Sequence, residues 1–255
     1  MAILGIDHII IIGDDLDTLI ASYRSAGFTV TPGGRHPWGT HNALVPMEDG
    51  FYIELLSFWT DDHDAHRRNA LLQMVGGLIE FMLTSNDIEQ DITAANSRGA
   101  AYTNLAPGRR MRPDGTEIHW IDGPTKNHTA AIPALIQDVT DRVLRVPDGD
   151  ARQHENGIQG LARLTLVVAD LAQTVDSYVA LLNRTPEPMQ MGGSALFSIG
   201  PHRIELHQPP PHSEMSDHLA TFGDSPYAAR FYGDQSYHIQ NIPGGAGVVS
   251  GAKNC

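Results

Sequence analysis

Polar side chains that could do chemistry interrupt the apolar stretches of this chain at a few places. The clearest is His8, in the middle of the β-branched run 6–12. A polar group inside a buried strand is costly unless it has a partner, so His8 is expected to be paired. Imidazole, guanidinium, indole and amide groups that could bind a small molecule gather in or just after a stretch rich in Gly and Pro: Arg35, His36, Trp38, His41 and Asn42.

A second polar stretch, residues 107–115, carries Arg109, Arg110 and Arg112. Because the chain is acidic overall, a local arginine cluster could recruit a carboxylate or phosphate substrate. The alternative is that Arg112-Pro113-Asp114-Gly115 is only a turn, since Pro-Asp-Gly favours one. Both interpretations stay open at the level of sequence.

A repeat indicates which elements must position these residues. The segment 5–16 is typical of a strand that runs into a helix start, and its outline returns twice. An offset of 72 residues carries Gly5 onto Gly77, and an offset of 155 carries it onto Gly160. Several coincidences at fixed offsets, without gaps, predict three copies of one supersecondary unit.

The first copy, residues 1–58, has the pattern of a βαβββ unit. A strand at 6–12 is followed by helical spacing that ends at Gly27, and three further strands are expected at 28–31, 40–46 and 51–58. Gly and Pro predict that residues 32–39 form a loop.

The second copy, residues 77–140, repeats this order, with a loop expected at 107–115. Residues 60–75 are expected to form a helix that joins the two copies. Residues 146–157 are rich in polar residues and predict a linker. The third copy is a degenerate βαβββ-like module within 158–255, with an irregular C-terminal tail. The predicted fold class is α+β.

Composition narrows the partners. The formal charge of −13 argues against nucleic acid and anionic membranes, so a small molecule is the expected partner. The longest apolar runs are too short for a membrane span, and no secretory signal is visible at the start. The single cysteine, Cys255, allows no internal disulfide, which fits a cytoplasmic protein.

Tandem βαβββ units with a His on the opening strand resemble the vicinal oxygen chelate superfamily. More narrowly, the chain resembles its glyoxalase-like domain branch, of the glyoxalase/bleomycin resistance/dioxygenase fold. The motifs that carry this resemblance are Gly39-Thr40-His41-Asn42-Ala43-Leu44, Phe51-Tyr52-Ile53-Glu54-Leu55-Leu56, Arg112-Pro113-Asp114-Gly115 and Ile132-Pro133-Ala134-Leu135-Ile136-Gln137. The resemblance implies that residues 1–145 form a cup-shaped, open barrel of two modules with helices outside.

The resemblance also implies a divalent metal, Zn, Mn, Ni, Fe or Co, held inside the cup by one residue from the first and last strand of each module. Carried onto this chain, the ligands are His8, Glu54, Glu80 and Gln137, with His8 and Glu80 as the catalytic pair and Glu80 as a base. Common metal-binding members have His where Glu80 stands, or Glu where Gln137 stands. The alternative is a His8–Glu54 hydrogen bond without a metal.

In the third copy Arg163 replaces His8, while Glu205 matches Glu54. An Arg–Glu pair is far more often a structural ion pair than a ligand set, so this copy is expected to be metal-free. One such unit leaves its sheet half open, and a homodimer is therefore expected.

Two classes of function follow from the resemblance. The first is a metal-dependent enzyme on a small oxygenated metabolite, a lyase or isomerase, with a ring-cleaving dioxygenase ranked below these two. Its substrate-binding residues would be Arg35, His36, Trp38, His41, Asn42, Arg112 and Trp120. The second is a metal-free binding protein of the bleomycin-resistance kind, in which no cofactor is present and aromatic residues line the cup: Trp38, Tyr52, Phe58 and Trp120.

Overall fold

The computed structural model describes residues 3–60, 77–126, 129–189, 192–234, 237–242 and 245–250. The expected helix at 60–75 lies outside these ranges, apart from its first residue. The helical segments of the described ranges are α1 (Leu16–Ser25), α3 (Ile88–Ser97), α4 (Arg142–Arg145), the 3-10 turn η1 (Gly149–Arg152), α5 (Leu171–Leu182) and α6 (Glu214–Phe222). The barrel strands are β1 (Ile3–Ile12), β2 (Thr31–Arg35), β3 (Thr40–Pro46), β4 (Tyr52–Phe58), β5 (Gly77–Ser85), β6 (Ala106–Met111), β7 (Glu117–Gly123) and β8 (Ala134–Asp138).

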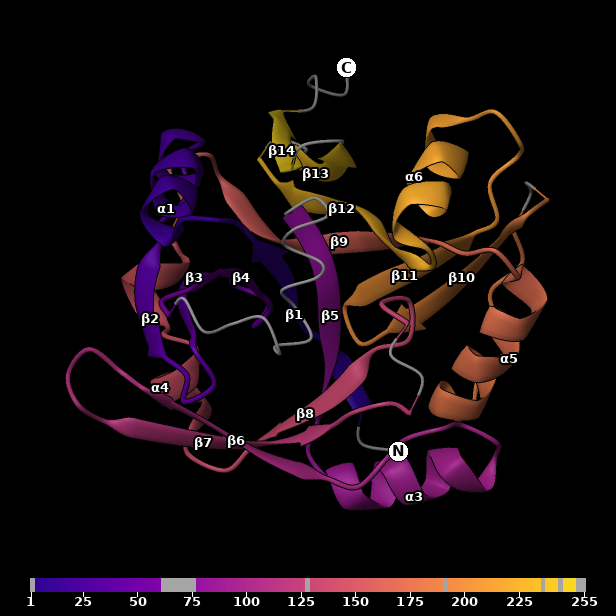
Figure 1. Ribbon diagram of the computed structural model, residues 1–255, viewed down its shortest axis with the longest axis horizontal. Coiled ribbons are helices and arrows are strands. Elements are labelled where there is room, and N and C mark those ends of the chain that lie inside the picture. The colour runs from indigo at the N-terminus through magenta and orange to yellow at the C-terminus, as the bar shows by residue number, and fades with distance from the viewer. Residues whose placement is uncertain are drawn as a thin grey trace.

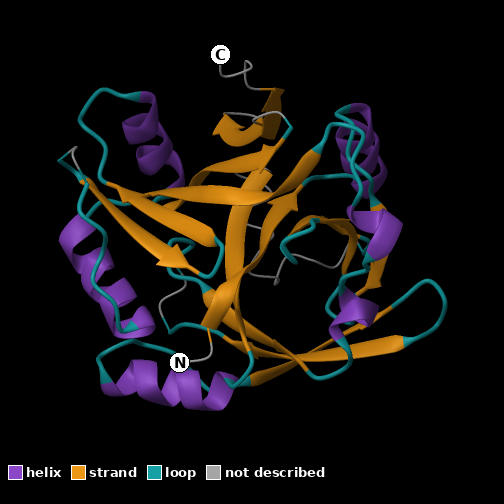
Figure 2. Ribbon diagram, turned by 180° about the vertical axis from the view of Figure 1, so that it is seen from behind, coloured by secondary structure: helices purple, strands orange, loops and turns teal. Residues whose placement is uncertain are grey.

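The eight strands β1–β8 form a closed barrel in the order β1-β4-β3-β2-β6-β7-β8-β5. Each half has the same internal order, and in each the opening strand pairs in parallel with the closing strand. The helices lie around the outside of the strands (Figure 2). The predicted α+β fold, with two modules in one curved sheet, is confirmed.

The offset of 72 residues is visible in the pairing of β1 with β5. His8 pairs with Met82, Ile9 with Phe81 and Ile10 with Glu80, so the two strands are related by a local two-fold axis at Ile9. The module helices begin alike as well. Asp15, Asp87 and Asp170, related by the same offsets, each cap the first turn of α1, α3 or α5 with a side-chain oxygen.

A single residue pair, Arg35 with Met111, closes the barrel between β2 and β6. The expectation of an open cup with loops at 32–39 and 107–115 is therefore wrong in this detail, because strands β2 and β6 occupy part of both stretches. Gly34 makes the closure possible. A Cβ at this position would lie 2.0 Å from the carbonyl oxygen of Met111, so only glycine lets the two backbones approach.

A second sheet has the order β10-β11-β9-β12-β13-β14. Its strands are β9 (Ile158–Val167), β10 (Ser194–Ile199), β11 (His202–His207), β12 (Ser225–Gly233), β13 (Tyr237–Ile242) and β14 (Gly245–Ser250). Residues 214–250 thus contain a helix and three strands where an irregular tail was expected. The β12 strand pairs antiparallel with β9, as β5 does with β1, so pairing with a neighbour overrides the weak local signal.

The third module shares one hydrophobic core with the barrel. Apolar residues on the outer face of β1 and β5, such as Ile9 and Phe81, belong to the same buried cluster as Leu164 on β9 and Tyr178 on α5. Figure 1 shows β5 between the β1–β4 half of the barrel and the sheet that carries α5 and α6.

The expected linker, 146–157, also packs against the first module, because the backbone N–H of Asn156 donates to the carbonyl of Gly27. In the described ranges, no helix has both the length and the apolar character needed to cross a membrane.

Candidate functional site

Side chains from most of the barrel strands surround a small hollow inside the barrel. Its volume of about 50 Å³ is enough for a few water-sized groups. Polar and apolar side chains share its wall, which is typical of a small-molecule site. The lining residues are His8, His36, Trp38, Asn42, Tyr52, Glu54, Met82, Arg110, Trp120, Asp122, Ile136 and Arg145.

His8 is buried and has an acidic residue on each side. Its Nδ1 lies 2.7 Å from Oδ1 of Asp7, and its Nε2 lies 3.6 Å from Oε2 of Glu54. Consecutive residues of a regular strand point to opposite faces, but the pairing of β1 with β5 shifts register between Ile6 and His8. This irregularity lets Asp7 reach the ring of His8.

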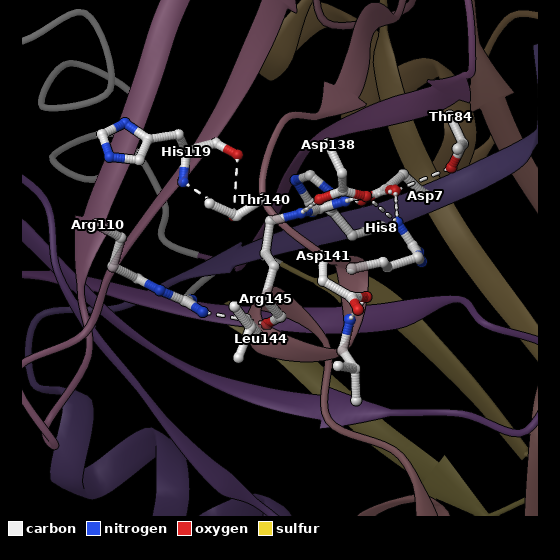
Figure 3. Close-up of polar contacts among 12 residues, drawn as sticks. Asp7, His8, Thr84, Arg110, His119, Asp138, Thr140, Asp141, Leu144 and Arg145 are labelled. Atoms are coloured by element: carbon white, nitrogen blue, oxygen red, sulfur yellow. Dashed lines mark hydrogen bonds and ion pairs between the residues drawn. The ribbon is translucent and has the colours of Figure 1, made fainter.

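Asp7 is fully buried and receives several donors (Figure 3). Arg145 donates to both carboxylate oxygens at 2.9 and 3.0 Å, Arg142 donates to Oδ2 at 2.7 Å, and the Thr84 hydroxyl donates to Oδ2 at 2.8 Å. Burial alone would raise the pKa of Asp7, but Arg145 and Arg142 outweigh it and hold that pKa well below its usual value. Asp7 is therefore ionised.

The ionised state of Asp7 decides the tautomer of His8. A carboxylate can only accept a hydrogen bond, so Nδ1 of His8 carries a proton, and in the neutral ring the lone pair is on Nε2. This Nε2 is the atom on the Glu54 side of the ring. Tyr52 stacks on the ring of His8, with ring centroids 4.6 Å apart, and its hydroxyl accepts from Nη1 of Arg145 at 2.9 Å. The ring of His8 is thus held in one orientation.

A chain of hydrogen bonds leads from Glu54 to Arg110. Asn42 donates from Nδ2 to Oε1 of Glu54 at 2.6 Å and accepts at Oδ1 from Nη1 of Arg110 at 3.0 Å. Gly33 leaves room for this amide, because a Cβ there would lie 2.0 Å from Oδ1 of Asn42. A carboxylate and a guanidinium are therefore held in the same wall with an amide between them.

Aromatic rings form another part of the wall. His36 stacks on Trp38 with centroids 4.9 Å apart, and Trp120 meets both rings edge-on at 6.0 and 6.3 Å. Nδ1 of His36 lies 2.8 Å from the hydroxyl of Thr40, which orients the ring. Such a wall suits a flat or apolar part of a ligand.

Of the four residues expected to bind a metal, the structure brings His8 and Glu54 together. Glu80 is partly buried and does not belong to the lining of the hollow. Gln137 lies elsewhere, because its Oε1 accepts from the backbone N–H of Ile88 at 2.7 Å at the start of α3.

Strand register explains the position of Gln137. Glu54 pairs with Ile10, and the residue that pairs with the equivalent Met82 is Ala134. The second module therefore has an apolar residue where the first has Glu54.

These positions do not fit a metal held in the expected way. In the part of the chain that the structure describes, no three His, Cys, Asp or Glu side chains come together in an arrangement that could hold a metal ion. His8 and Glu54 supply two donors, whereas protein sites for zinc commonly use three or more.

The remaining predicted substrate-binding residues divide into two groups. His36, Trp38, Asn42 and Trp120 line the hollow, while Arg35, His41 and Arg112 do not. The guanidinium of Arg35 lies over the ring of Trp59 at 4.9 Å. Arg112 donates to the carbonyl of Leu144 at 3.0 Å and pairs with Asp114.

Sequence reasoning assigned neither Asp7 nor Arg145 to the site. It gave Tyr52 only as a cup-lining residue of the binding-protein alternative, and Arg110 only as part of a cluster that could recruit an anion. The available signals were the charge of Asp7 beside His8 in an apolar strand, and the position of Tyr52 two residues before Glu54. Arg110 was grouped with its exposed neighbours, and only its inward orientation on β6 separates it from them.

The comparisons with known proteins agree on the fold. The family model of the glyoxalase-like domain matches residues 6–182. A hypothetical protein from Staphylococcus aureus superposes with a TM-score of 0.65 at 17% identity, covering 80% of this chain and 86% of that one. A search of curated proteins found no match.

Two further solved structures are similar. A mutant of 4-hydroxymandelate synthase from Streptomyces coelicolor has a TM-score of 0.59 at 12% identity, covering 89% of this chain and 70% of that one. A fusion of a xylose isomerase-like TIM barrel with 4-hydroxyphenylpyruvate dioxygenase has a TM-score of 0.58 at 15% identity, covering 91% of this chain and 37% of that one. At these identities the likeness shows the fold alone.

The family match covers well over half of the chain, and the barrel of paired βαβββ modules accounts for most of it. The resemblance to the vicinal oxygen chelate superfamily is confirmed, and the chain belongs to the glyoxalase-like domain family.

Proposed function

We propose that this protein is an enzyme of the lyase or isomerase type that moves a proton on a small oxygenated molecule bound in the hollow. The observation that carries the proposal is the state of His8. Ionised Asp7 accepts from Nδ1, so the Nε2 lone pair is available as a general base beside Glu54.

The proposed step begins when Nε2 of His8 takes a proton from a carbon next to a substrate carbonyl. The electron pair of the broken C–H bond moves into an enediolate or enolate, whose oxygen needs a hydrogen-bond donor or cation. In an isomerase the proton returns to the neighbouring carbon, while the hydroxyl proton of that carbon moves to the enolate oxygen. In a lyase the carbonyl re-forms, a β-substituent leaves with the electron pair of its own bond, and the imidazolium gives it the proton. Glu54, at 3.6 Å, stabilises the imidazolium formed in between.

The transfer of the proton from carbon uses only His8 and Glu54. A divalent metal was expected from the family, and it would supply a Lewis acid at the substrate oxygen. The described donors near Nε2 of His8 are too few to fit such an ion, so no step of the reaction is assigned to it.

A second candidate function is a binding protein without catalysis. The aromatic wall of His36, Trp38 and Trp120 favours it, because stacked rings can hold a flat molecule without any proton transfer. The two candidates differ in what happens to a bound molecule.

Exchange of carbon-bound hydrogen with solvent separates these candidates. Pyruvate and dihydroxyacetone are incubated with the protein in D₂O, and loss of their C–H signals is followed by NMR. The enzyme proposal predicts exchange above the buffer rate with at least one compound, which His8→Gln and Glu54→Gln abolish. Arg163→Gln, on the third module, is the matched control and keeps the wild-type rate. Binding without exchange would favour the second candidate, and exchange that survives His8→Gln would contradict the assigned base.

A further inference from the structure

Arg110 is a buried cation whose partners are neutral. It lies on β6, is 3% exposed, and belongs to the lining of the hollow. Its Nη1 donates to the amide oxygen of Asn42 at 3.0 Å, and its Nη2 donates to the backbone carbonyl of Arg145 at 3.1 Å. In the described part of the chain no carboxylate forms an ion pair with it, since Asn42 stands between it and Glu54.

Arg145, a second buried arginine of the same site, differs from Arg110 in its partners. It is equally buried, but it pairs with the carboxylates of Asp7 and Asp138. Although burial opposes the charge, Asp7 holds the pKa of Arg145 well above its usual value. Burial lowers the pKa of Arg110 to about 10, so its charge is under-compensated by comparison.

A donor of Arg110 also lacks a partner. Its Nε is buried and, among the described residues, makes no hydrogen bond. Buried donors are nearly always satisfied, so an orphaned one in the wall of a hollow indicates a group that arrives with a ligand. A guanidinium binds planar oxyanions best, and carboxylates above all.

We infer that Arg110 is the receptor for a carboxylate of the ligand, and that the site takes small organic monocarboxylates with a compact apolar part. The inference rests on the proposed function and names its class of substrate. The carboxylate neutralises Arg110 and gives its Nε an acceptor. The apolar part meets Met82, Trp120 and Ile136, and the carbon that loses its proton is held near Nε2 of His8.

The charges around the hollow favour a monoanion over a dianion. Glu54 and Asp122 line the same wall as Arg110, so a second negative charge on the ligand would face carboxylates. The volume of about 50 Å³ limits the enclosed part to a few heavy atoms. Inorganic phosphate is therefore expected to bind more weakly than acetate or pyruvate.

The experiment measures binding of acetate and pyruvate to the purified full chain by isothermal calorimetry, with acetamide as the neutral counterpart of acetate and with chloride and inorganic phosphate as further anions. The wild-type protein is expected to bind both carboxylates and to ignore acetamide. Arg110→Met is expected to raise the dissociation constant about 10- to 100-fold, the range for losing hydrogen bonds to a charged group.

Arg109→Met is the matched control. Arg109 is the preceding residue on β6, its side chain is 57% exposed, and it pairs with Glu117 outside the hollow. This variant is expected to bind carboxylates as the wild type does. If Arg110→Met does not fold, Arg110→Lys decides the point, because it keeps the charge, loses the planar fork and should bind acetate several-fold more weakly.

Equal binding of acetate and acetamide, or unchanged carboxylate binding in Arg110→Met, would overturn the inference. Binding of chloride and phosphate as tight as that of acetate would also overturn it, because Arg110 would then be an unspecific anion site. Failure of the proposed function looks different. Carboxylates that bind through Arg110 without C–H exchange would end only the enzyme proposal, whereas exchange on a neutral compound in Arg110→Met would end only this inference.

Discussion

The first and third modules place different residue pairs at the same point of the same scaffold. His8 and Glu54 lie on the paired strands β1 and β4, and Arg163 and Glu205 hold the equivalent register positions on β9 and β11. In the third module, Nη1 of Arg163 donates to Oε2 of Glu205 at 2.8 Å, in a partly exposed ion pair. In the first, Nε2 of His8 and Glu54 remain 3.6 Å apart in a buried hollow.

The neighbours explain why one pair is reactive and the other structural. Asp7 fixes the tautomer of His8, whereas Ala162 stands at the equivalent place beside Arg163. An arginine stays protonated at any ordinary pH and cannot accept a proton, so the third-module pair can only attract. A shared fold therefore supplies the position, and a few residues decide the chemistry.

The largest effect is expected from making the first pair like the third. His8→Arg puts a permanent cation beside Glu54 and removes the lone pair, so the rate of C–H exchange should fall about 10²- to 10⁴-fold. The reverse change, Arg163→His, should leave the rate unchanged. A rate that survives His8→Arg would mean that the two pairs do not differ in the way proposed.

The next effect concerns stability. Asp7→Asn removes the charge that satisfies Arg142 and Arg145 inside the protein, and it is expected to lower the free energy of unfolding by about 3–5 kcal/mol. Glu205→Gln breaks the partly exposed pair with Arg163 and should cost about 0–1 kcal/mol. Urea denaturation of both variants measures the contrast, which would fail if the two losses were equal.

Acid should affect the two regions in different pH ranges. Burial lowers the pKa of His218 on α6 from 6.5 to about 4, so the unfolded state takes up the proton first. This contribution is fully present above pH 6.5 and is lost as the pH falls toward 4.

The pKa of Asp7 is depressed below 3.8, so its contribution is present above that pH and is lost only as the pH falls further. Thermal unfolding from pH 7.5 to 3 should therefore lose stability first between 6.5 and 4. His218→Gln should flatten that part of the curve and leave the part below it; an unchanged curve would contradict the assignment.

The smallest effect is expected from a chelator. Because the described donors do not fit a metal, EDTA should leave the melting temperature and the exchange rate of the wild-type protein unchanged. Elemental analysis of the purified protein is the measurement that could contradict this prediction. A stoichiometric divalent metal that is lost in both His8→Ala and Glu54→Ala would show that the first pair does hold an ion.

Local sequence patterns predicted the repeat, because strand and helix periodicity and the capping aspartates are local. The pairing of the modules was implied by the family resemblance. These local patterns did not predict positions that depend on a strand far away in the sequence. The family resemblance puts Gln137 at the position of Glu54, but the register between β5 and β8 puts Ala134 there. Register is a property of two strands, and one strand does not reveal it.

The site shows the same limit. Arg110 stands in a stretch whose composition is typical of a loop. The pairing of β6 with β7 and the closure at Gly34 make it part of a buried wall. The hydrogen bond between Asp7 and His8 depends on an irregularity in the pairing of β1 with β5, which the run of isoleucines does not predict. His8 itself could be chosen because a polar residue in such a run needs a partner.

The most direct test of the account is the state of the His8 ring, read from ¹H–¹⁵N NMR spectra of the histidine side chains with His8→Gln for assignment. The account predicts a proton on Nδ1, a lone pair on Nε2, and a shift of the Nε2 signal when pyruvate is added. The opposite tautomer in the free protein, or a ring that does not respond to pyruvate bound in calorimetry, would contradict it.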